Sequence, residues 1–181
     1  NAATITVGAV SQVPYGIVNE STFNNNTGGQ ISIDRWTNIG LNNVTGGTFT
    51  NVATITIGVI VVANGGDYGI RNESVFNNNT GGQINIDRSR IWGLYNFTGG
   101  TFTNAATITM GAAASVGNYG IWNNAAFNNN TGGQIKIDRW TSNGLNNVSG
   151  GTFTNAATIT IGALPSTGFY GIFNESVFNN N

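Results

Sequence analysis

Residues 46–58 read Gly-Gly-Thr-Phe-Thr-Asn-Val-Ala-Thr-Ile-Thr-Ile-Gly, and this stretch decides the fold. Polar and apolar residues alternate in it twice, first around Phe49 and then through Ile55 and Ile57. Such alternation turns one face of a strand inward and the other toward solvent, and Thr, Ile and Phe suit a pleated surface. The leading Gly-Gly pair is turn material that interrupts helices. The stretch therefore predicts two short β-strands preceded by a tight turn.

The second half of this stretch opens a tandem repeat. The pattern Asn-x-Ala-Thr-Ile-Thr-x-Gly occurs four times, at intervals of 50, 53 and 51 residues. Self-similarity at a fixed period is the signature of repeat architectures, so we expect a single repetitive domain over residues 1–181. The four repeats are residues 1–50, 51–103, 104–154 and the incomplete 155–181.

Each repeat contains two related halves of about 26 residues. Each half carries a Gly-(Ile/Leu)-x-Asn signature followed by a phenylalanine, and the phenylalanines are 25 to 27 residues apart. The signatures begin at Gly16, Gly40, Gly69, Gly93, Gly120, Gly144 and Gly171. The phenylalanines are Phe23, Phe49, Phe76, Phe102, Phe127, Phe153 and Phe178. The chain therefore holds about seven units, arranged as three and a half double repeats.

A unit of this length accommodates three short strands and three turns, which make one coil of a parallel β-solenoid whose coils stack about 4.8 Å apart. We therefore predict an all-β, right-handed parallel β-solenoid of about seven coils, roughly 34 Å long from the strand spacing. The phenylalanines would form one core column, and asparagines at the turns would form amide ladders between coils. A β-propeller with blades of about 51 residues is the alternative. The related half-units, which are too short to be blades, argue against it.

The composition excludes several classes of function. Charged residues make up 7% of the chain and the net charge is −1, so nucleic acid and anionic membrane surfaces lack the positive charge they need in a partner. The sequence contains neither Cys nor His, which excludes disulfides, thiol catalysis and Cys- or His-ligated zinc. No apolar run approaches the roughly 20 residues of a membrane span. We expect no cofactor, no metal and no nucleic-acid partner.

The carboxylates recur with the scaffold. Glutamates occur at Glu20, Glu73 and Glu175, in the half-units that also carry Asp-Arg pairs. The pairs are Asp34-Arg35, Asp87-Arg88 and Asp138-Arg139. A glycosidase needs one unrepeated pair of carboxylates, whereas these residues repeat every second coil. We therefore assign no catalytic residue and expect the pairs to be charged turns that keep the rod soluble.

Nine Asn-x-Ser/Thr sequons occur, and a chain this rich in Asn and Thr forms many by composition alone. The sequence leaves their glycosylation open. The sequon asparagines are Asn19, Asn25, Asn43, Asn72, Asn78, Asn96, Asn129, Asn147 and Asn174.

Three tryptophans, Trp36, Trp92 and Trp140, lie at or near the Asp-Arg turns and outside the phase of the phenylalanines. Together with the apolar tip that contains Val61, they are candidates for lateral contact between rods or for stacking on sugar rings. Packing into a corner of the coil is the alternative explanation.

The two ends of the chain match in phase. If Asn181 abutted Asn1 of a second copy, Phe178 would lie eight residues before the first core isoleucine of that copy, an interval that also occurs within the repeats. Bare strand edges favour further pairing, and a head-to-tail contact that does not close makes a filament. The predicted end-to-end contact consists of Asn1, Ile5, Phe178 and Asn181.

The repeats also resemble a known family. Gly-Gly-Thr-Phe-Thr-Asn-x-Ala-Thr-Ile-Thr-Ile-Gly and Phe-Asn-Asn-Asn-Thr-Gly-Gly-Gln-Ile are similar to the Asn/Thr/Gly-rich β-helical repeats of large bacterial surface proteins. These proteins include filamentous-haemagglutinin-type adhesins and long repeat proteins of Bacteroidota. The resemblance spans the whole chain and rests on repeat style. It implies an extracellular or cell-surface scaffold, and no functional residue carries over.

These observations lead us to expect a structural subunit or segment of an extracellular filament, with a matrix, surface-fibre or adhesion role and with itself as partner. A carbohydrate-binding surface adhesin that uses the aromatic and Asn-rich faces is the first alternative. A polysaccharide-cleaving β-helix enzyme is the second.

Overall fold

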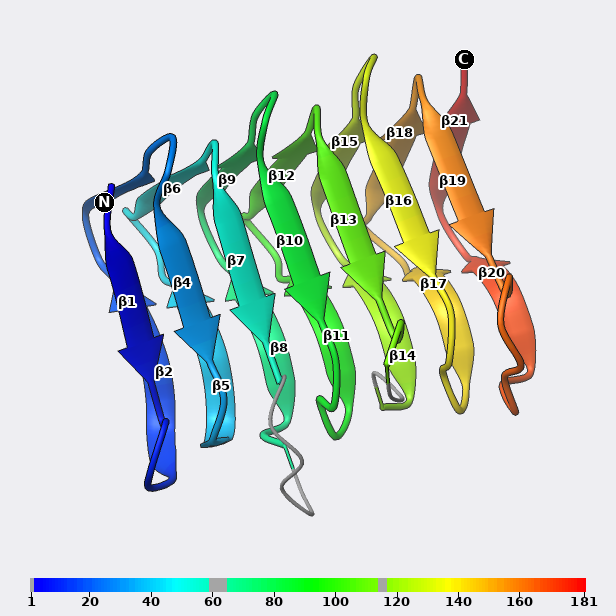
Figure 1. Cartoon of the computed structure of the whole chain (residues 1–181). Coiled ribbons are helices and arrows are strands. Elements are labelled where there is room, and N and C mark those ends of the chain that lie inside the picture. The colour runs from blue at the N-terminus through cyan, green and yellow to red at the C-terminus, as the bar shows by residue number, and fades with distance from the viewer. Residues whose placement is uncertain (1, 59–64, 114–116) are drawn as a thin grey trace.

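The computed structural model describes residues 2–58, 65–113 and 117–181, and within these ranges every regular element is a β-strand (Figure 1). Twenty-one strands follow one another there in a cycle of three, and each member of the cycle belongs to a different seven-stranded sheet. Three consecutive strands make one coil, which we call a rung, and seven rungs stack along one axis. The predicted parallel β-solenoid is confirmed.

The strand bounds follow the repeat. The first sheet contains β1 (Thr4–Val7), β4 (Gln30–Ile33), β7 (Thr54–Ile57), β10 (Gln83–Ile86), β13 (Thr107–Met110), β16 (Gln134–Ile137) and β19 (Thr158–Ile161). The second contains β2 (Val13–Asn19), β5 (Trp36–Asn43), β8 (Tyr68–Asn72), β11 (Trp92–Asn96), β14 (Tyr119–Asn123), β17 (Asn143–Asn147) and β20 (Tyr170–Asn174). The third contains β3 (Thr22–Asn25), β6 (Thr48–Asn51), β9 (Val75–Asn78), β12 (Thr101–Asn104), β15 (Ala126–Asn129), β18 (Thr152–Asn155) and β21 (Val177–Asn180).

All neighbouring strands are parallel, and equivalent residues of successive rungs are paired. In the third sheet Phe49 pairs with both Phe23 and Phe76, and in the first sheet Ile31 pairs with Ile55. Each double repeat therefore spreads over all three sheets, whereas a propeller blade would be a sheet of its own. The N-terminal and C-terminal rungs lie at opposite ends of the rod (Figure 1).

The core contains one continuous column of phenylalanine rings. Successive rings have centroids 4.6–5.2 Å apart and planes within 3–11° of parallel. Isoleucine, leucine and methionine side chains of the other two sheets pack beside this column. Burying each of these side chains stabilises the fold by roughly 1.5–3 kcal/mol. The five inner phenylalanines are completely buried, whereas Phe23 and Phe178 in the terminal rungs are only partly buried.

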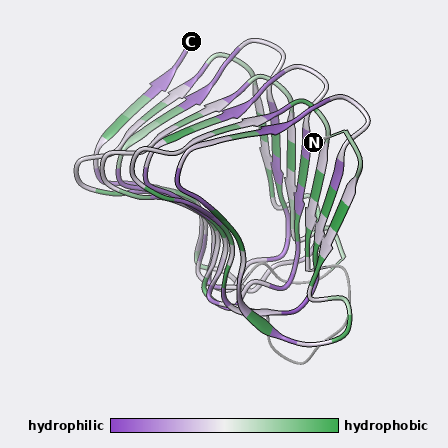
Figure 2. Ribbon diagram, turned by 90° about the vertical axis from the view of Figure 1, so that its left-hand side faces the viewer, coloured by the Kyte–Doolittle hydropathy of each residue, from purple (hydrophilic) through white to green (hydrophobic). Residues whose placement is uncertain are grey.

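The strands of the second sheet bend at a glycine. In β11 Gly93 and the following Leu94 are both buried, whereas Trp92 and Tyr95 on either side are half-buried. A Cβ on Gly93 would lie 2.7 Å from the carbonyl oxygen of Gly120 in the next rung, so only glycine allows this approach. The bend makes the outer side of the second sheet concave in cross-section (Figure 2).

Candidate functional site

Two ladders of asparagine side chains run the length of the rod. In both, the Nδ2 of one asparagine donates to the Oδ1 of the equivalent asparagine in the next rung, at N–O distances of 2.7–2.9 Å. The ladder that ends the second-sheet strands consists of Asn19, Asn43, Asn72, Asn96, Asn123, Asn147 and Asn174. The ladder that ends the third-sheet strands consists of Asn25, Asn51, Asn78, Asn104, Asn129, Asn155 and Asn180. The predicted amide ladders are present.

The inner ladder amides also bind the main chain. The Nδ2 of Asn72 donates to the carbonyl oxygens of Ser74, at 2.9 Å, and Thr101, at 3.3 Å. The Oδ1 of Asn72 accepts the backbone N–H of Ser74 at 3.4 Å. Leaving a buried polar group unpaired costs about 1–3 kcal/mol, and these contacts avoid that cost. Because every Nδ2 donates toward the later rung, each ladder has a direction and the two ends of the rod differ chemically.

All nine sequon asparagines are ladder members. In eight of them the nitrogen that would carry a glycan donates to the next rung, whereas Asn174 in the last rung donates to the carbonyl oxygen of Ser176. Eight of these residues are buried, and Asn174 in the last rung is exposed. A glycan on any of the eight is incompatible with the ladder.

The Asp-Arg pairs bind the backbone of neighbouring rungs. Arg139 Nη1 donates to the carbonyl oxygen of Gly111 at 2.8 Å, and the arginines of the other two pairs make the same contact at 3.2 and 2.8 Å. In the opposite direction, Asp138 Oδ1 accepts the backbone N–H of Leu164 at 3.1 Å. The carboxylate of Asp138 is completely buried and lies 3.1 Å from Lys136 Nζ. These turns therefore tie successive rungs together, and the buried carboxylate of Asp138 does not give the rod the solubility that we expected from its charge.

The carboxylates lie at separate corners of the rung. The glutamates follow strands of the second sheet and the aspartates follow strands of the first, with two strands between them along the chain. Glu73 forms an ion pair with Arg71. Among the residues that the structure describes, no group of three or more His, Cys, Asp or Glu side chains could hold a metal ion.

Two of the three tryptophans that were candidates for surface contact are buried. Trp36 is completely buried and its Nε1 donates to the carbonyl oxygen of Tyr68 at 2.8 Å, while Trp140 is 6% exposed. Gly66 and Gly168, which lie just before the next second-sheet strand, pack against the two indoles, and a Cβ on either glycine would lie 2.1 Å from the ring. Their burial excludes lateral contact for these two residues and agrees with the alternative, packing into a corner of the coil.

The other two residues of the candidate lateral contact, Trp92 and Val61, are not among these buried indoles. Trp92 is half-buried and lies on the outer side of the second sheet. Val61 lies outside the described residues.

Five aromatic side chains, which we call the aromatic face, gather where Trp92 lies. They are Tyr68, Trp92, Tyr95, Tyr119 and Trp122. In the register of the sheet, Trp92 pairs with Tyr68 and Tyr119, and Tyr95 pairs with Trp122. The sequence contains a signal for this cluster that we did not use. Aromatic residues occupy both x positions of x-Gly-(Ile/Leu)-x in two consecutive units.

Burial changes the acidity of two phenols in the aromatic face. It raises the pKa of Tyr68, an effect that the positive charge of Arg71 opposes and the negative charge of Asp67 reinforces. Burial also raises the pKa of Tyr95. The neighbouring Tyr68 raises it further, and the positive charge of Arg71 opposes this increase. Both hydroxyl groups therefore remain protonated hydrogen-bond donors at neutral pH.

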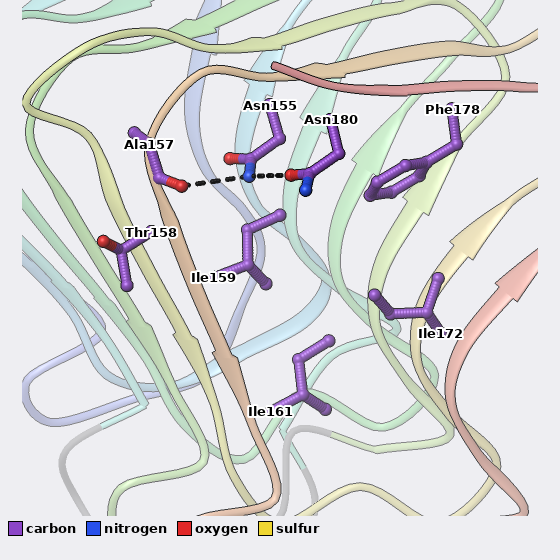
Figure 3. A pocket seen from close by; sticks show the side chains of 8 residues that line it. All are labelled: Asn155, Ala157, Thr158, Ile159, Ile161, Ile172, Phe178 and Asn180. Atoms are coloured by element: carbon purple, nitrogen blue, oxygen red, sulfur yellow. Dashed lines mark hydrogen bonds between the residues drawn. The ribbon is translucent and has the colours of Figure 1, made fainter.

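At the C-terminal rung the core opens to the surface. A recess of about 560 Å³ lies there, and Figure 3 shows the side chains that line it. In this rung Ile172 is 46% exposed, whereas its register partner Leu145 in the preceding rung is completely buried. The recess is lined by Asn155, Ala157, Thr158, Ile159, Ile161, Ile172, Phe178 and Asn180.

The residues of the predicted end-to-end contact lie at the two ends of the rod. Phe178 lines the C-terminal recess and Asn181 is exposed next to it. Ile5 is partly buried in the opposite terminal rung, and Asn1 lies outside the described residues. A contact between these ends stays a prediction.

In the described part of the chain, no helix has the length and apolar character needed to cross a membrane. No protein-family model matches the chain, and neither a curated protein nor a solved structure matches it.

Proposed function

We propose that this chain is a structural subunit or segment of an extracellular β-solenoid filament, with a mechanical role in a matrix, a surface fibre or adhesion. The observation that supports this most is the unbroken register of the rod. Three parallel sheets, one phenylalanine column and two asparagine ladders continue through all seven rungs. A fold in which each repeat contacts only its neighbours can be extended by further repeats without a change of structure.

The terminal rungs favour such extension. Ile159, Ile161 and Phe178 occupy core positions but are only partly buried in the last rung, and Ile5 and Val7 are partly buried in the first. Exposed strand edges also present unpaired backbone groups to another strand. A further rung on either end would bury these side chains and pair these edges.

The direction of the ladders favours head-to-tail stacking. Because each ladder Nδ2 donates toward the C-terminal rung, two like ends would bring donors to donors or acceptors to acceptors. Opposite ends would continue both ladders. A heterologous contact of this kind does not close, and it generates a filament.

The extracellular location rests on the resemblance of the repeats to those of bacterial surface proteins. The low charge, at 7% of residues, agrees with a passive scaffold whose contacts are mainly hydrogen bonds and apolar packing.

The proposal is tested by imaging the purified chain by negative-stain electron microscopy and measuring its mass by analytical ultracentrifugation. We expect unbranched filaments with an axial repeat of about 34 Å, from seven strand spacings. Ile172→Lys places a charge on the end that stacking would bury, and it should yield single rods. Val177→Lys is the matched control, because Val177 is 50% exposed in the same rung but lies on the outer side of its sheet. Wild-type rods that stay single at high concentration, or equal behaviour of the two variants, would contradict the proposal.

A further inference from the structure

The aromatic face lies on the concave outer side of the second sheet, across three consecutive rungs. The strand bend turns the two residues that flank the buried Gly-(Ile/Leu) pair toward each other. The ring centroids of Trp92 and Tyr95 are 5.5 Å apart, and those of Tyr119 and Trp122 are 4.6 Å apart. The rings of each pair therefore converge on the outer side of the sheet.

The five rings fall into two orientations. Four of them lie roughly parallel to one another, and the fifth, Trp122, stands across them. Tyr68 and Tyr95 stack on Trp92, with planes 17° and 26° from parallel. Trp122 instead stands at 85° to Trp92, 74° to Tyr95 and 84° to Tyr119. None of these three rings therefore stacks parallel on the indole of Trp122, in contrast to the rings that stack on Trp92.

The orientation of Trp122 is held by a hydrogen bond. Its Nε1 donates to the Oδ1 of Asn124 at 2.5 Å. The side chain is also half-buried, which restricts its rotation. A ring fixed in this way loses little conformational entropy when a ligand contacts it.

The charges around the aromatic face are paired. Arg71 forms an ion pair with Glu73, and its guanidinium lies 4.8 Å from the ring centroid of Phe97. Arg90 Nε donates to Asp67 Oδ1 at 2.6 Å. Two positive and two negative side chains thus neutralise one another, which favours an uncharged ligand over nucleic acid or an acidic polymer.

We propose that the aromatic face binds a neutral polysaccharide chain, with Trp122 as the ring on which a sugar packs. The apolar face of a pyranose ring matches an indole, and its hydroxyl groups match the phenols of Tyr68, Tyr95 and Tyr119, which combine an apolar body with a polar tip. The face spans three consecutive rungs, so a linear chain that lies along the rod axis contacts all three. This site differs from the sugar-stacking site predicted from the sequence, because Trp36 and Trp140 are buried.

The test measures binding of the intact chain to neutral linear oligosaccharides of glucose, N-acetylglucosamine, xylose and mannose, by titration calorimetry, and to the corresponding insoluble polymers by co-sedimentation. We expect at least one of the four sugars to bind. Trp122→Ala should weaken that binding by about tenfold or more, as loss of an aromatic contact predicts. Phe169→Ala is the control, because Phe169 is 80% exposed but lies outside the aromatic face. It should bind like the wild type.

Three results would overturn the proposal. The first is that none of the neutral sugars binds. The second is that only an anionic polysaccharide such as heparin binds. The third is that Trp122→Ala binds the sugar as tightly as the wild type does. Circular dichroism and the thermal midpoint establish that each variant is folded. If Trp122→Ala does not fold, Trp122→Phe keeps an aromatic ring at the same position, and Tyr95→Ala provides the loss-of-contact variant. Repeating the titration with Ile172→Lys separates sugar binding from filament assembly.

Discussion

At the scale of single residues, the asparagine ladders restrict the sequence more tightly than the hydrophobic core does. A core column accepts exchange of aliphatic side chains, since Met110 pairs in register with Ile86 and Ile137 and is completely buried with them. A ladder position needs a donor and an acceptor on one short stem. Aspartate lacks the donor, alanine lacks both groups, and glutamine adds a methylene that shifts the amide.

The ladder predicts a large cost for a single truncation. Asn78 accepts from Asn51 at 2.8 Å and donates to Asn104 at 2.7 Å. Asn78→Ala removes both contacts within a buried column, so we expect the free energy of unfolding to fall by about 2–4 kcal/mol, from one or two buried groups left without partners. Guanidinium chloride titration measures this loss. Asn77→Ala is the matched control on the outer side of the same strand, with an expected loss below about 1 kcal/mol. Equal losses in the two variants would show that the ladder contributes no special stability.

At the scale of the strand, the second sheet departs from simple alternation. The first and third sheets alternate buried and half-buried residues, as in β7 and β12, and their sequence predicts this pattern. In β11 the buried residues are adjacent, because the chain bends at Gly93. The signature Gly-(Ile/Leu)-x-Asn marked this position in the sequence. Its period alone did not reveal that the glycine permits a close approach between rungs.

The close approach predicts that the same substitution has different effects in different rungs. At Gly93 a Cβ would meet the carbonyl oxygen of Gly120 at 2.7 Å and the sulfur of Met110 at 3.2 Å. Gly93→Ala should therefore lower the free energy of unfolding by about 1–3 kcal/mol, as overpacking does. Gly171 holds the equivalent position in the last rung, where a Cβ would have only an ordinary contact with Ile161 at 3.6 Å. Gly171→Ala should change the thermal midpoint little, and a comparable loss in both variants would refute the steric explanation.

At the scale of the whole molecule, repetition made most of the fold predictable. Once the phase of Phe49 within one unit was known, the register of every other rung followed, and with it the phenylalanine column and the ladders. The prediction failed where the units differ. The connections that contain Gly66 and Gly168, which contact Trp36 and Trp140, vary in length and sequence between units, so the burial of these indoles depends on contacts that no period encodes. At the position of Tyr95 and Trp122 in the aromatic face, four other units carry valine, asparagine or arginine, and only three-dimensional packing shows that the rings converge.

The coincidence of sequons and ladders makes a prediction for the whole rod. When the chain is secreted from a eukaryotic cell, a glycan attached before folding would break a ladder at that rung. The folded, protease-resistant fraction should therefore carry no glycan at the eight buried sequons, and the glycosylated chains should remain protease-sensitive. Peptide mapping of the two fractions by mass spectrometry measures this distribution. Gln30→Asn supplies the matched control, since it creates a sequon with Ser32 at an exposed position on the outer side of β4. A glycan there leaves the ladders intact and should appear in folded rods, whereas a glycan on Asn78 or Asn96 in that fraction would mean that the rod forms without a continuous ladder.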